Sequence, residues 1–426
     1  MKFTRLIPAL ATALVFALAM AVPVNAQLQL TSPASYTIRD LGPVGGPPGQ
    51  PFVLKNDGLV SGSAAVASGA ENAVLWLNGA MADIGNPGLK GRNSIAFGVN
   101  EIGQAVGEAE TSASDPTGED FCGFQALGFS SSATTCLPFL WQNGVMTPLQ
   151  TLGGTNGFAN QINNRSVAAG GAENTTLDSG CPAPQKYQFK PVIWQQGQVH
   201  ELSTNGDPDG IAFAINDKGQ VVGASGQCTT FNPVSFVYLL PVHALLWQNG
   251  TTTDLGTLGG SFGNIAFSVN NQGQVVGPSD LAGDLTFHGF LWTQATGMQD
   301  LGTVQDDVAS AALAINDGGV VVGASLDANF NSRAFVRQNG NLVDLNALIA
   351  GDSPLYLLLA CSINSSGQIV GLAFDTSTGD LHGYLASPSS RVAEGRPKLA
   401  SLPISVQMLV QRMRFGRFAA RHTGVQ

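Results

Sequence analysis

Apolar residues along this chain fall into short runs of about five residues, separated by polar turns that return in the same order. The clearest example is Asn216–Ser225, where one apolar run has just ended at Ile215 and a second begins at Val221. Asn can close such a turn with its own side chain, and Gly219 tolerates a positive φ near the exit of the turn. The pattern predicts a β-hairpin.

The same turn recurs along most of the chain, each time with a glycine seven residues after the asparagine. Full copies begin at Asn100, Asn163, Asn216, Asn270, Asn316 and Asn364, and a copy shorter by one residue begins at Asn56. An internal repeat decides the architecture before any single residue is interpreted. We therefore expect each of these asparagines to begin the hairpin turn of one structural repeat.

Two further apolar runs accompany each hairpin. One reaches its end at a tryptophan in five units and at Arg337 and Ala386 in the last two. The tryptophans are Trp76, Trp141, Trp194, Trp247 and Trp292. A tight reversal such as Asn249-Gly250 follows, and then a strand of the Asp-Leu-Gly type, such as Asp254–Gly256. Each unit therefore predicts four short strands.

Four-stranded repeats of about 45–65 residues have the length of propeller blades. The Asp-Leu-Gly-type strands, the hairpins and the Trp-type strands each occur seven times. We predict an all-β, seven-bladed β-propeller over residues 27–387. The first Asp-Leu-Gly strand precedes the first hairpin, so it either opens the first blade or completes the blade begun near His382; the sequence leaves both arrangements open.

The ends of the chain differ from its body. Residues 1–26 have a basic start, an apolar run and small residues at its end, which predicts a secretory signal peptide cut between Ala26 and Gln27. No later apolar stretch is long enough to span a membrane as a helix. Residues 388–426 carry seven basic residues against one acid, and we expect disorder or a short helix there.

The composition narrows the location and the partners. Together with the leader, it predicts a secreted protein, extracellular or periplasmic. The formal net charge of the chain is −10, so the acidic body excludes nucleic acid as a partner. Cys122 and Cys136 lie in one insertion, and Cys181 and Cys228 follow consecutive hairpins, so two disulfides are expected with the pairing left open. Cys361 is expected to be a buried free thiol.

Three strings of residues resemble a known family. Ala212–Asn216, His243–Trp247 and His288–Trp292, with Thr257–Gly260 between two of them, are similar to the HAF repeats of bacterial extracellular proteins. The resemblance covers nearly the whole mature body. It implies an exported, propeller-like repeat protein without an assigned reaction or ligand.

Recurring polar residues are weighed against a structural role. His243, His288 and His382 occupy the same place in separate units, so we expect them to lie apart and not to form a metal site. The recurring acids are expected to be strand-end hydrogen-bond acceptors. They are Asp40, Asp83, Asp254, Asp300 and Asp344. The chain has no nucleophile elbow, phosphate loop or dinucleotide fingerprint, so we assign no catalytic residue, cofactor or metal.

Function is sought in the parts that do not repeat, namely the insertions at 108–138, 172–190 and 224–242. We expect a non-enzymatic binding or cell-surface interaction module whose partner is an extracellular glycan or protein. The alternatives are a polysaccharide hydrolase with its site at the channel mouth and a structural matrix protein. A close carboxylate pair outside the repeated positions would favour the hydrolase, and a shallow aromatic groove without acids would favour sugar binding.

Overall fold

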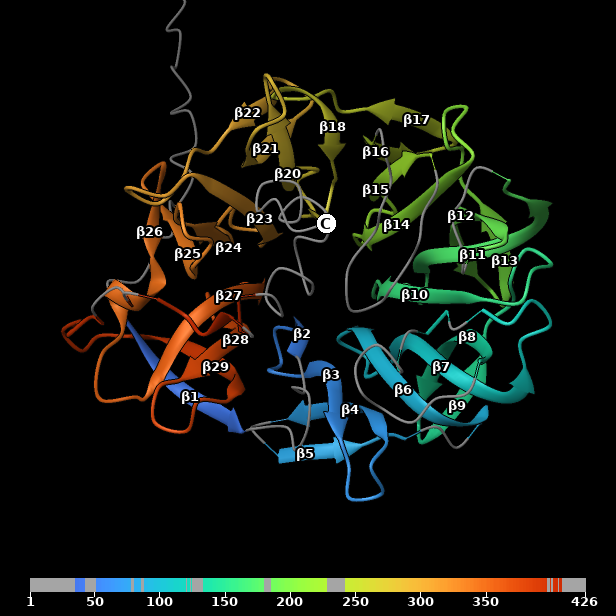
Figure 1. Ribbon diagram of the computed structural model, residues 1–426, viewed down its shortest axis with the longest axis horizontal. Coiled ribbons are helices and arrows are strands. Elements are labelled where there is room, and N and C mark those ends of the chain that lie inside the picture. The colour runs from blue at the N-terminus through green and yellow to red at the C-terminus, as the bar shows by residue number, and fades with distance from the viewer. Residues whose placement is uncertain are drawn as a thin grey trace, which may run out of the picture. The chain divides into compact units, whose positions relative to one another are not determined.

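Seven antiparallel sheets stand side by side in a ring in the computed structural model (Figure 1). The structure describes residues 35–42, 51–77, 80–85, 88–119, 121–122, 124, 133–179, 185–227, 242–396, 399, 401–404 and 406–407. Each sheet has four positions from the inside of the ring outwards, as the repeat predicts. The seven-bladed β-propeller is therefore confirmed.

The blades follow one another along the chain, and the strands of each blade are numbered outwards from the axis of the ring. The first three are β2 (Pro51–Leu54), β3 (Val60–Ala65), β4 (Glu71–Leu77), β5 (Ala80–Asp83); β6 (Lys90–Val99), β7 (Ala105–Ser114), β8 (Thr134–Gln142), β9 (Val145–Pro148); and β10 (Gly157–Ile162), β11 (Ala168–Leu177), β12 (Tyr187–Gln195), β13 (Gln198–Glu201). The next three are β14 (Asp209–Ile215), β15 (Val221–Gly226), β16 (Val242–Gln248), β17 (Thr251–Asp254); β18 (Gly259–Asn264) with β19 (Ser268–Val269), β20 (Val275–Leu281), β21 (Phe287–Thr293), β22 (Gly297–Asp300); and β23 (Ala309–Ile315), β24 (Val321–Leu326), β25 (Ser332–Gln338), β26 (Asn341–Asp344). The last is β27 (Leu355–Ile363), β28 (Ile369–Asp375), β29 (Leu381–Ser389) and, outermost, β1 (Ser35–Gly42), and the 3-10 helix η2 (Leu345–Leu348) precedes it.

The last blade closes the ring with both ends of the described chain. Strand β1 pairs with β29 in antiparallel register, Tyr36 opposite Pro388 and Ile38 opposite Ala386. Figure 1 shows the blue β1 beside the red β29. Of the two arrangements left open by the sequence, the second is the one observed: the first Asp-Leu-Gly strand completes the blade that contains His382.

The recurring glycine of the second strand is required by close packing. A Cβ atom on Gly223 would lie 2.0 Å from the carbonyl oxygen of Ile211 on the innermost strand, which no side chain tolerates. Gly107, Gly170, Gly277, Gly323 and Gly371 meet their innermost strands in the same way. The repeat therefore keeps glycine where two strands approach closely, and a large side chain of the third strand, Phe335 for example, packs against that glycine.

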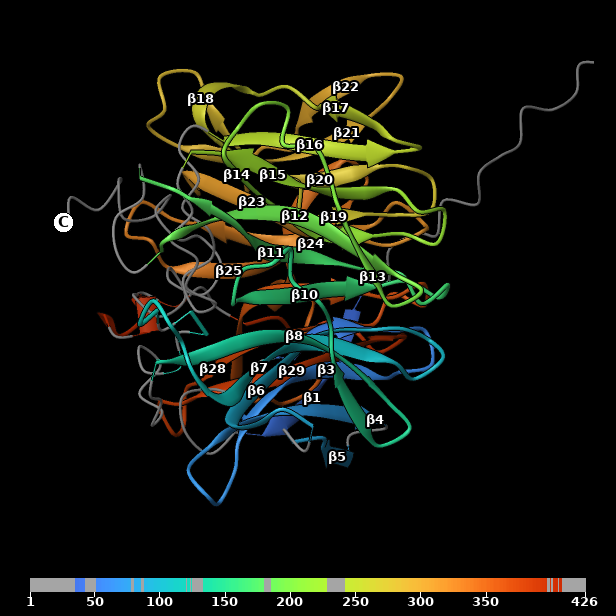
Figure 2. The ribbon, with the colours of Figure 1, turned by 90° about the vertical axis from the view of Figure 1, so that its right-hand side faces the viewer.

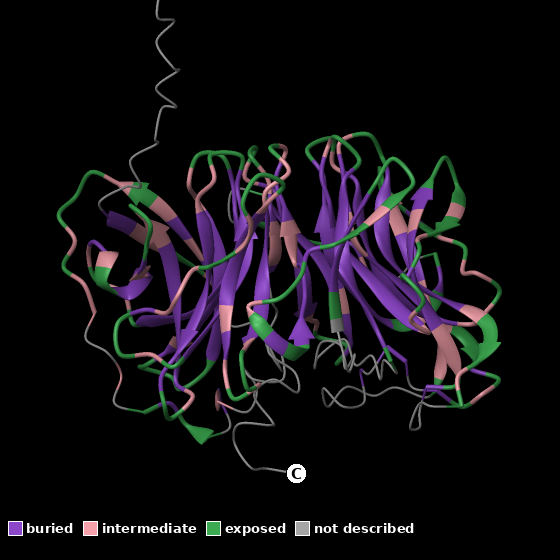
Figure 3. Cartoon of the chain, turned by 90° about the horizontal axis from the view of Figure 1, so that it is seen from above, coloured by how far each residue is buried: buried purple, intermediate pink, exposed green. Residues whose placement is uncertain are grey.

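The ring has two distinct faces. Strands run across its thickness (Figure 2), and buried strands lie between exposed turns at both edges (Figure 3). We call turn face the edge that carries the hairpins between innermost and second strands, such as the turn at Asn216. We call loop face the opposite edge, where second strands connect to third strands and where the insertions lie. Binding residues on the two faces therefore come from different parts of each repeat.

The beginning of the C-terminal tail is ordered against the ring. The main-chain N–H of Arg396 donates to the carbonyl of Asn346, and Leu402 is buried. The N–H of Leu402 also donates to Oδ1 of Asn331, 2.9 Å away. The expectation of a disordered tail is therefore wrong for these residues, because their apolar side chains complete the core of the last blades. The expected signal peptide, with Ala26 and Gln27, lies outside the described residues, and no described helix is long and apolar enough to cross a membrane.

Candidate functional site

The turn at Asn216 shows what every repeat builds at the turn face. Oδ1 of Asn216 accepts hydrogen bonds from the N–H groups of Lys218 and Gln220, at 3.0 and 2.9 Å, and so closes the turn as the sequence predicts. The amide Nδ2 of the same side chain donates to the carbonyl of Asn270 in the next blade, at 2.8 Å. Each turn therefore also connects two blades.

This connection is repeated around the ring and forms what we call the inner belt. The donors and acceptors are Asn100 to Asn163, Asn163 to Asn216, Asn216 to Asn270, Asn270 to Asn316, Asn316 to Asn364, and Asn364 to Lys55. These six hydrogen bonds join consecutive blades. They are buried or partly buried, so each donor that lost its acceptor would remain unsatisfied away from water.

The first blade departs from the predicted pattern. Its turn begins at Lys55, since the N–H of Lys55 donates to the carbonyl of Leu59 and the N–H of Gly58 donates to the carbonyl of Lys55. Asn56, expected to begin this turn, is its second residue. The prediction followed the residue type, whereas the spacing of seven residues to Gly62 starts at Lys55. One of seven repeats therefore places a cationic side chain where the others place an amide.

The second residues of the turns form a further ring, which we call the outer belt: Asn56, Glu101, Asn164, Asp217, Asn271, Asp317 and Ser365. Amides alternate with acids through most of it. Both N and Nδ2 of Asn164 donate to the carboxylate of Asp217, at 2.8 and 3.1 Å, and Asn271 holds Asp317 in the same way. Sequence reasoning missed this belt, although the alternation is visible one position after each recurring asparagine.

The two belts line a cavity of about 240 Å³ on the axis of the ring. Aliphatic side chains, among them Ile215, Val269 and Ile315, line it below the polar rim. None of the described residues that line it is aromatic, and Lys55 is the one that carries a positive charge. Burial lowers the pKa of the Lys55 ammonium, and the nearby carboxylates, Asp217 first among them, oppose that shift.

A second group of polar residues lies on the loop face and contains a carboxyl pair. Nδ2 of Asn156 donates to Oε2 of Glu119, in the first insertion, at 3.0 Å. The main-chain N–H of Asn156 donates to Oε2 of Glu173, on β11, at 2.9 Å. Burial first, and then the charge of Glu173, raise the pKa of Glu119 to about 8, so the protonated Glu119 donates a hydrogen bond to Glu173.

This pair meets one half of the test for a hydrolase. Glu119 lies outside the repeated positions and is close to a second carboxyl group. However, Glu119 is 2% exposed and Glu173 is 0% exposed, and neither lines the cavity on the axis. A substrate that needs two accessible carboxyl groups does not reach them, so we interpret the pair as a structural connection between an insertion and the third blade.

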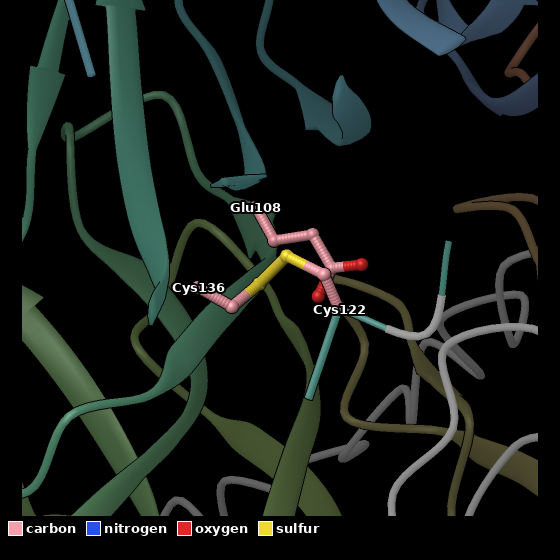
Figure 4. Close-up of side chains that lie close together, drawn as sticks. All are labelled: Glu108, Cys122 and Cys136. Atoms are coloured by element: carbon pink, nitrogen blue, oxygen red, sulfur yellow. A yellow bond between two sulfur atoms is a disulfide. The ribbon is translucent and has the colours of Figure 1, made fainter. Parts of the chain in front are cut away.

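The same insertion is crosslinked by a disulfide between Cys122 and Cys136. The buried carboxylate of Glu108 lies beside the two sulfur atoms (Figure 4), and all three groups lie within 4.8 Å of one another. Because the sulfurs are bonded to each other, they are not free to bind a metal ion. The disulfide instead fixes the insertion at its base, next to the second strand of its own blade.

The remaining cysteines divide between a described and an undescribed group. Cys361 on the innermost strand of the last blade is a buried free thiol, as expected. Cys181 and Cys228, expected to form a second disulfide, lie outside the described residues.

The recurring histidines and acids form pairs that sequence reasoning did not predict. Nδ1 of His243 lies 3.0 Å from Asp254, and Nδ1 of His288 lies 2.9 Å from Asp300. The aspartates also accept from the N–H two residues on, for example Gly256 to Asp254 at 2.9 Å, as expected for strand-end acceptors. In each pair the histidine is on the third strand and the aspartate on the fourth, so the pairs lie in separate blades.

Comparison with known proteins gives similarity of fold alone. The chain matches no protein-family model and no curated protein. Among solved structures it is similar to a puromycin-hydrolysing peptidase of Mycobacterium tuberculosis, with 12% identity, a TM-score of 0.45, and coverage of 88% of this chain and 56% of that one. A prolyl endopeptidase structure gives 12%, 0.46, 84% and 51%, and Trypanosoma rangeli sialidase gives 8%, 0.34, 83% and 55%. The chain spans about half the length of these proteins, and the propeller assignment rests on its own strand topology.

Proposed function

We propose that this protein is an exported, non-enzymatic binding module that takes a small, hydroxyl-rich ligand at the turn face. The observation that carries the proposal is the axial cavity of about 240 Å³ lined by both belts. It is smaller than the roughly 300–1,000 Å³ pockets that enclose drug-sized ligands, so it suits a single ring or the end of a chain.

The chemistry of the lining favours hydroxyl groups. A hydroxyl group both donates and accepts, and the rim offers carboxylates as acceptors beside amides and the Lys55 ammonium as donors. Each amide and acid of the outer belt already has a partner, as in Asn164 with Asp217, which holds these groups in place before a ligand arrives. Such fixed polar groups reduce the ordering cost of binding.

The charge of the lining decides which hydroxyl-rich ligands fit. Glu101, Asp217 and Asp317 oppose the single positive charge of Lys55. An acidic sugar would bring a further negative charge to these three carboxylates, whereas a neutral sugar or an amino sugar would not. We therefore propose that the ligand is the end of a neutral or amino-bearing glycan.

The observed site differs from the insertion-based site expected from the sequence, because the repeated turns line the cavity. The hydrolase alternative finds its carboxyl pair only in the buried Glu119 and Glu173. Binding without hydrolysis is therefore the function that the described geometry supports best.

The test is a glycan array that contains neutral, amino and acidic sugars, followed by calorimetric titration of any ligand found. We expect binding to neutral or amino sugars, and at least tenfold weaker binding after Asp217→Ala or Asp317→Ala. Lys218→Ala is the matched control, since Lys218 is an exposed residue of the same turn that does not line the cavity. Unchanged affinity in both aspartate variants, or selective binding of acidic sugars, would overturn the proposal.

A further inference from the structure

His382 differs from the other recurring histidines because a second carboxylate faces its ring. Its Nδ1 lies 2.9 Å from Oδ2 of Asp40, in the pairing shared by His243 and His288. Its Nε2 lies 4.0 Å from Oδ2 of Asp375, which no other described histidine has. The three residues come from β29, β1 and β28, so they meet only when the ring is closed.

The ring nitrogen that faces Asp375 lacks a hydrogen bond. The side chain of His382 is 6% exposed, and its Nε2 is buried without a hydrogen-bond partner among the described residues. Burial of an unsatisfied polar atom is unfavourable by about 1–3 kcal/mol. This nitrogen is therefore positioned for a partner that the polypeptide does not supply.

The surroundings match the way in which proteins prepare a histidine for a metal ion. A metal-binding histidine usually donates its other ring N–H to a carboxylate, which fixes the ring and leaves the second nitrogen unprotonated. Asp40 is in that position, with both carboxylate oxygens within 3.0 Å of Nδ1. Oδ1 of Asp375 accepts from Ser377, at 2.7 Å from N and 2.6 Å from Oγ, so Oδ2 is left to face the imidazole.

The distance between the two facing atoms also suits an ion. Zinc lies about 2.0–2.1 Å from a histidine nitrogen and about 2.0–2.2 Å from a carboxylate oxygen. An ion therefore fits between Nε2 of His382 and Oδ2 of Asp375, and a small rotation of the Asp375 side chain bends the arrangement towards a tetrahedral angle. Water reaches this group from the side of Asp40, whose side chain is 43% exposed.

We propose that His382 and Asp375 bind a divalent transition-metal ion, with Asp40 positioning the imidazole, and that the bound ion fastens the closing blade. The ligands are one imidazole nitrogen and one carboxylate oxygen, which suit Zn²⁺, Co²⁺, Ni²⁺ and Cu²⁺ better than Ca²⁺. Water completes the coordination. Because β1 supplies Asp40 and β29 supplies His382, binding stabilises the pairing of the two ends of the ring.

The test is titration of the metal-free, full-length protein with Co²⁺, followed by visible absorption, and competition with Zn²⁺. We expect one site that is lost in His382→Gln and in Asp375→Asn. In Asp40→Asn we expect about 10–100-fold weaker binding, because the ring loses its orientation. His288→Gln is the matched control: it removes a histidine with the same Asp partner but without a second carboxylate.

Thermal melting gives a second measurement. Zn²⁺ should raise the Tm of the wild type and of His288→Gln, and a chelator should reverse the rise, with no effect on Asp375→Asn. Binding that survives both His382→Gln and Asp375→Asn would overturn the proposal, as would a Tm that does not respond to Zn²⁺. In that outcome His382 is a charged imidazolium held between Asp40 and Asp375. If His382→Gln does not fold, Asp375→Asn and Asp40→Asn still decide.

Discussion

The side-chain amide of Asn216 donates a hydrogen bond to the main-chain carbonyl of Asn270, 2.8 Å away in the next blade. The oxygen of the same amide closes the turn of its own blade through the N–H groups of Lys218 and Gln220. One side chain thus stabilises a local turn and a contact between blades. Aspartate would satisfy the turn, but only an amide also supplies the donor to the neighbouring blade.

Asn216→Asp should therefore separate these two roles. The turn keeps an oxygen acceptor, whereas the buried donor to Asn270 is lost and a carboxylate oxygen faces the carbonyl. We expect the free energy of unfolding to fall by about 2–3 kcal/mol, measured by urea denaturation. Lys218→Ala, at an exposed position of the same turn, should stay within about 0.5 kcal/mol. An equally small change for Asn216→Asp would contradict the role of the inner belt.

Trp247 tests the contact between blades at the third strand. The indole is 4% exposed, and its Nε1 donates to the carbonyl of Ser203 at 2.7 Å. We expect Trp247→Ala to lower the free energy of unfolding by about 3–5 kcal/mol. Trp247→Phe should lower it less, because the ring still fills part of the space while the hydrogen bond is lost. A near-neutral alanine variant would remove this residue from the core.

Closure of the ring is tested by strand β1. Tyr36 is fully buried against the last blade, and deletion of residues 35–42 would leave β29 as an open edge. We expect the deletion to lower the Tm strongly and to promote aggregation, and a synthetic peptide of residues 35–42 to restore part of the Tm. Arg39→Ala, in the same strand but exposed, should melt like the wild type. A normal melting curve for the deletion would show that closure does not depend on β1.

The carboxyl pair of the loop face predicts a pH dependence of stability. The pKa of Glu119 is about 8 in the folded protein, against an ordinary value of 4.5. Between these values the folded state binds the extra proton, so stability falls as the pH rises from about 4.5 to about 8 and levels off above. The amide in Glu119→Gln does not titrate, so we expect a smaller fall in Tm over this interval.

Exposed Glu201→Gln serves as the control and should keep the pH profile of the wild type. Glu71 and Asp209, whose pKa values burial raises to about 8 and about 7, act in the same direction in every variant. The difference between profiles therefore isolates Glu119. Identical profiles for the wild type and Glu119→Gln would exclude the proton held between Glu119 and Glu173.

Much of the fold was predictable because the repeat is a local pattern. The glycine seven residues after each turn and the tryptophan at the end of the third strand mark the blades without knowledge of the ring. The turn role of Asn216 and the acceptor role of Asp254 were predictable for the same reason, since their partners lie within a few residues.

The candidate sites were less predictable because their partners lie far apart along the chain. Seven hairpins bring Lys55, Asp217 and Asp317 to one axial cavity, although each hairpin looks alike in sequence. Glu119 meets Glu173 only after an insertion of one blade folds onto the next. The error at Asn56 has the same origin, because hydrogen bonding, and not residue type, decides where that turn begins.

By itself, the sequence determined a seven-bladed ring of four-stranded blades, since apolar periodicity, glycine spacing and turn residues act over a few positions. The tertiary structure alone decided which strand completes the last blade, and which side chains meet there. His382 and Asp40 are 342 positions apart in the chain, yet they touch because strand pairing closes the ring. Convergence of this kind depends on the geometry of closure, which no local pattern encodes.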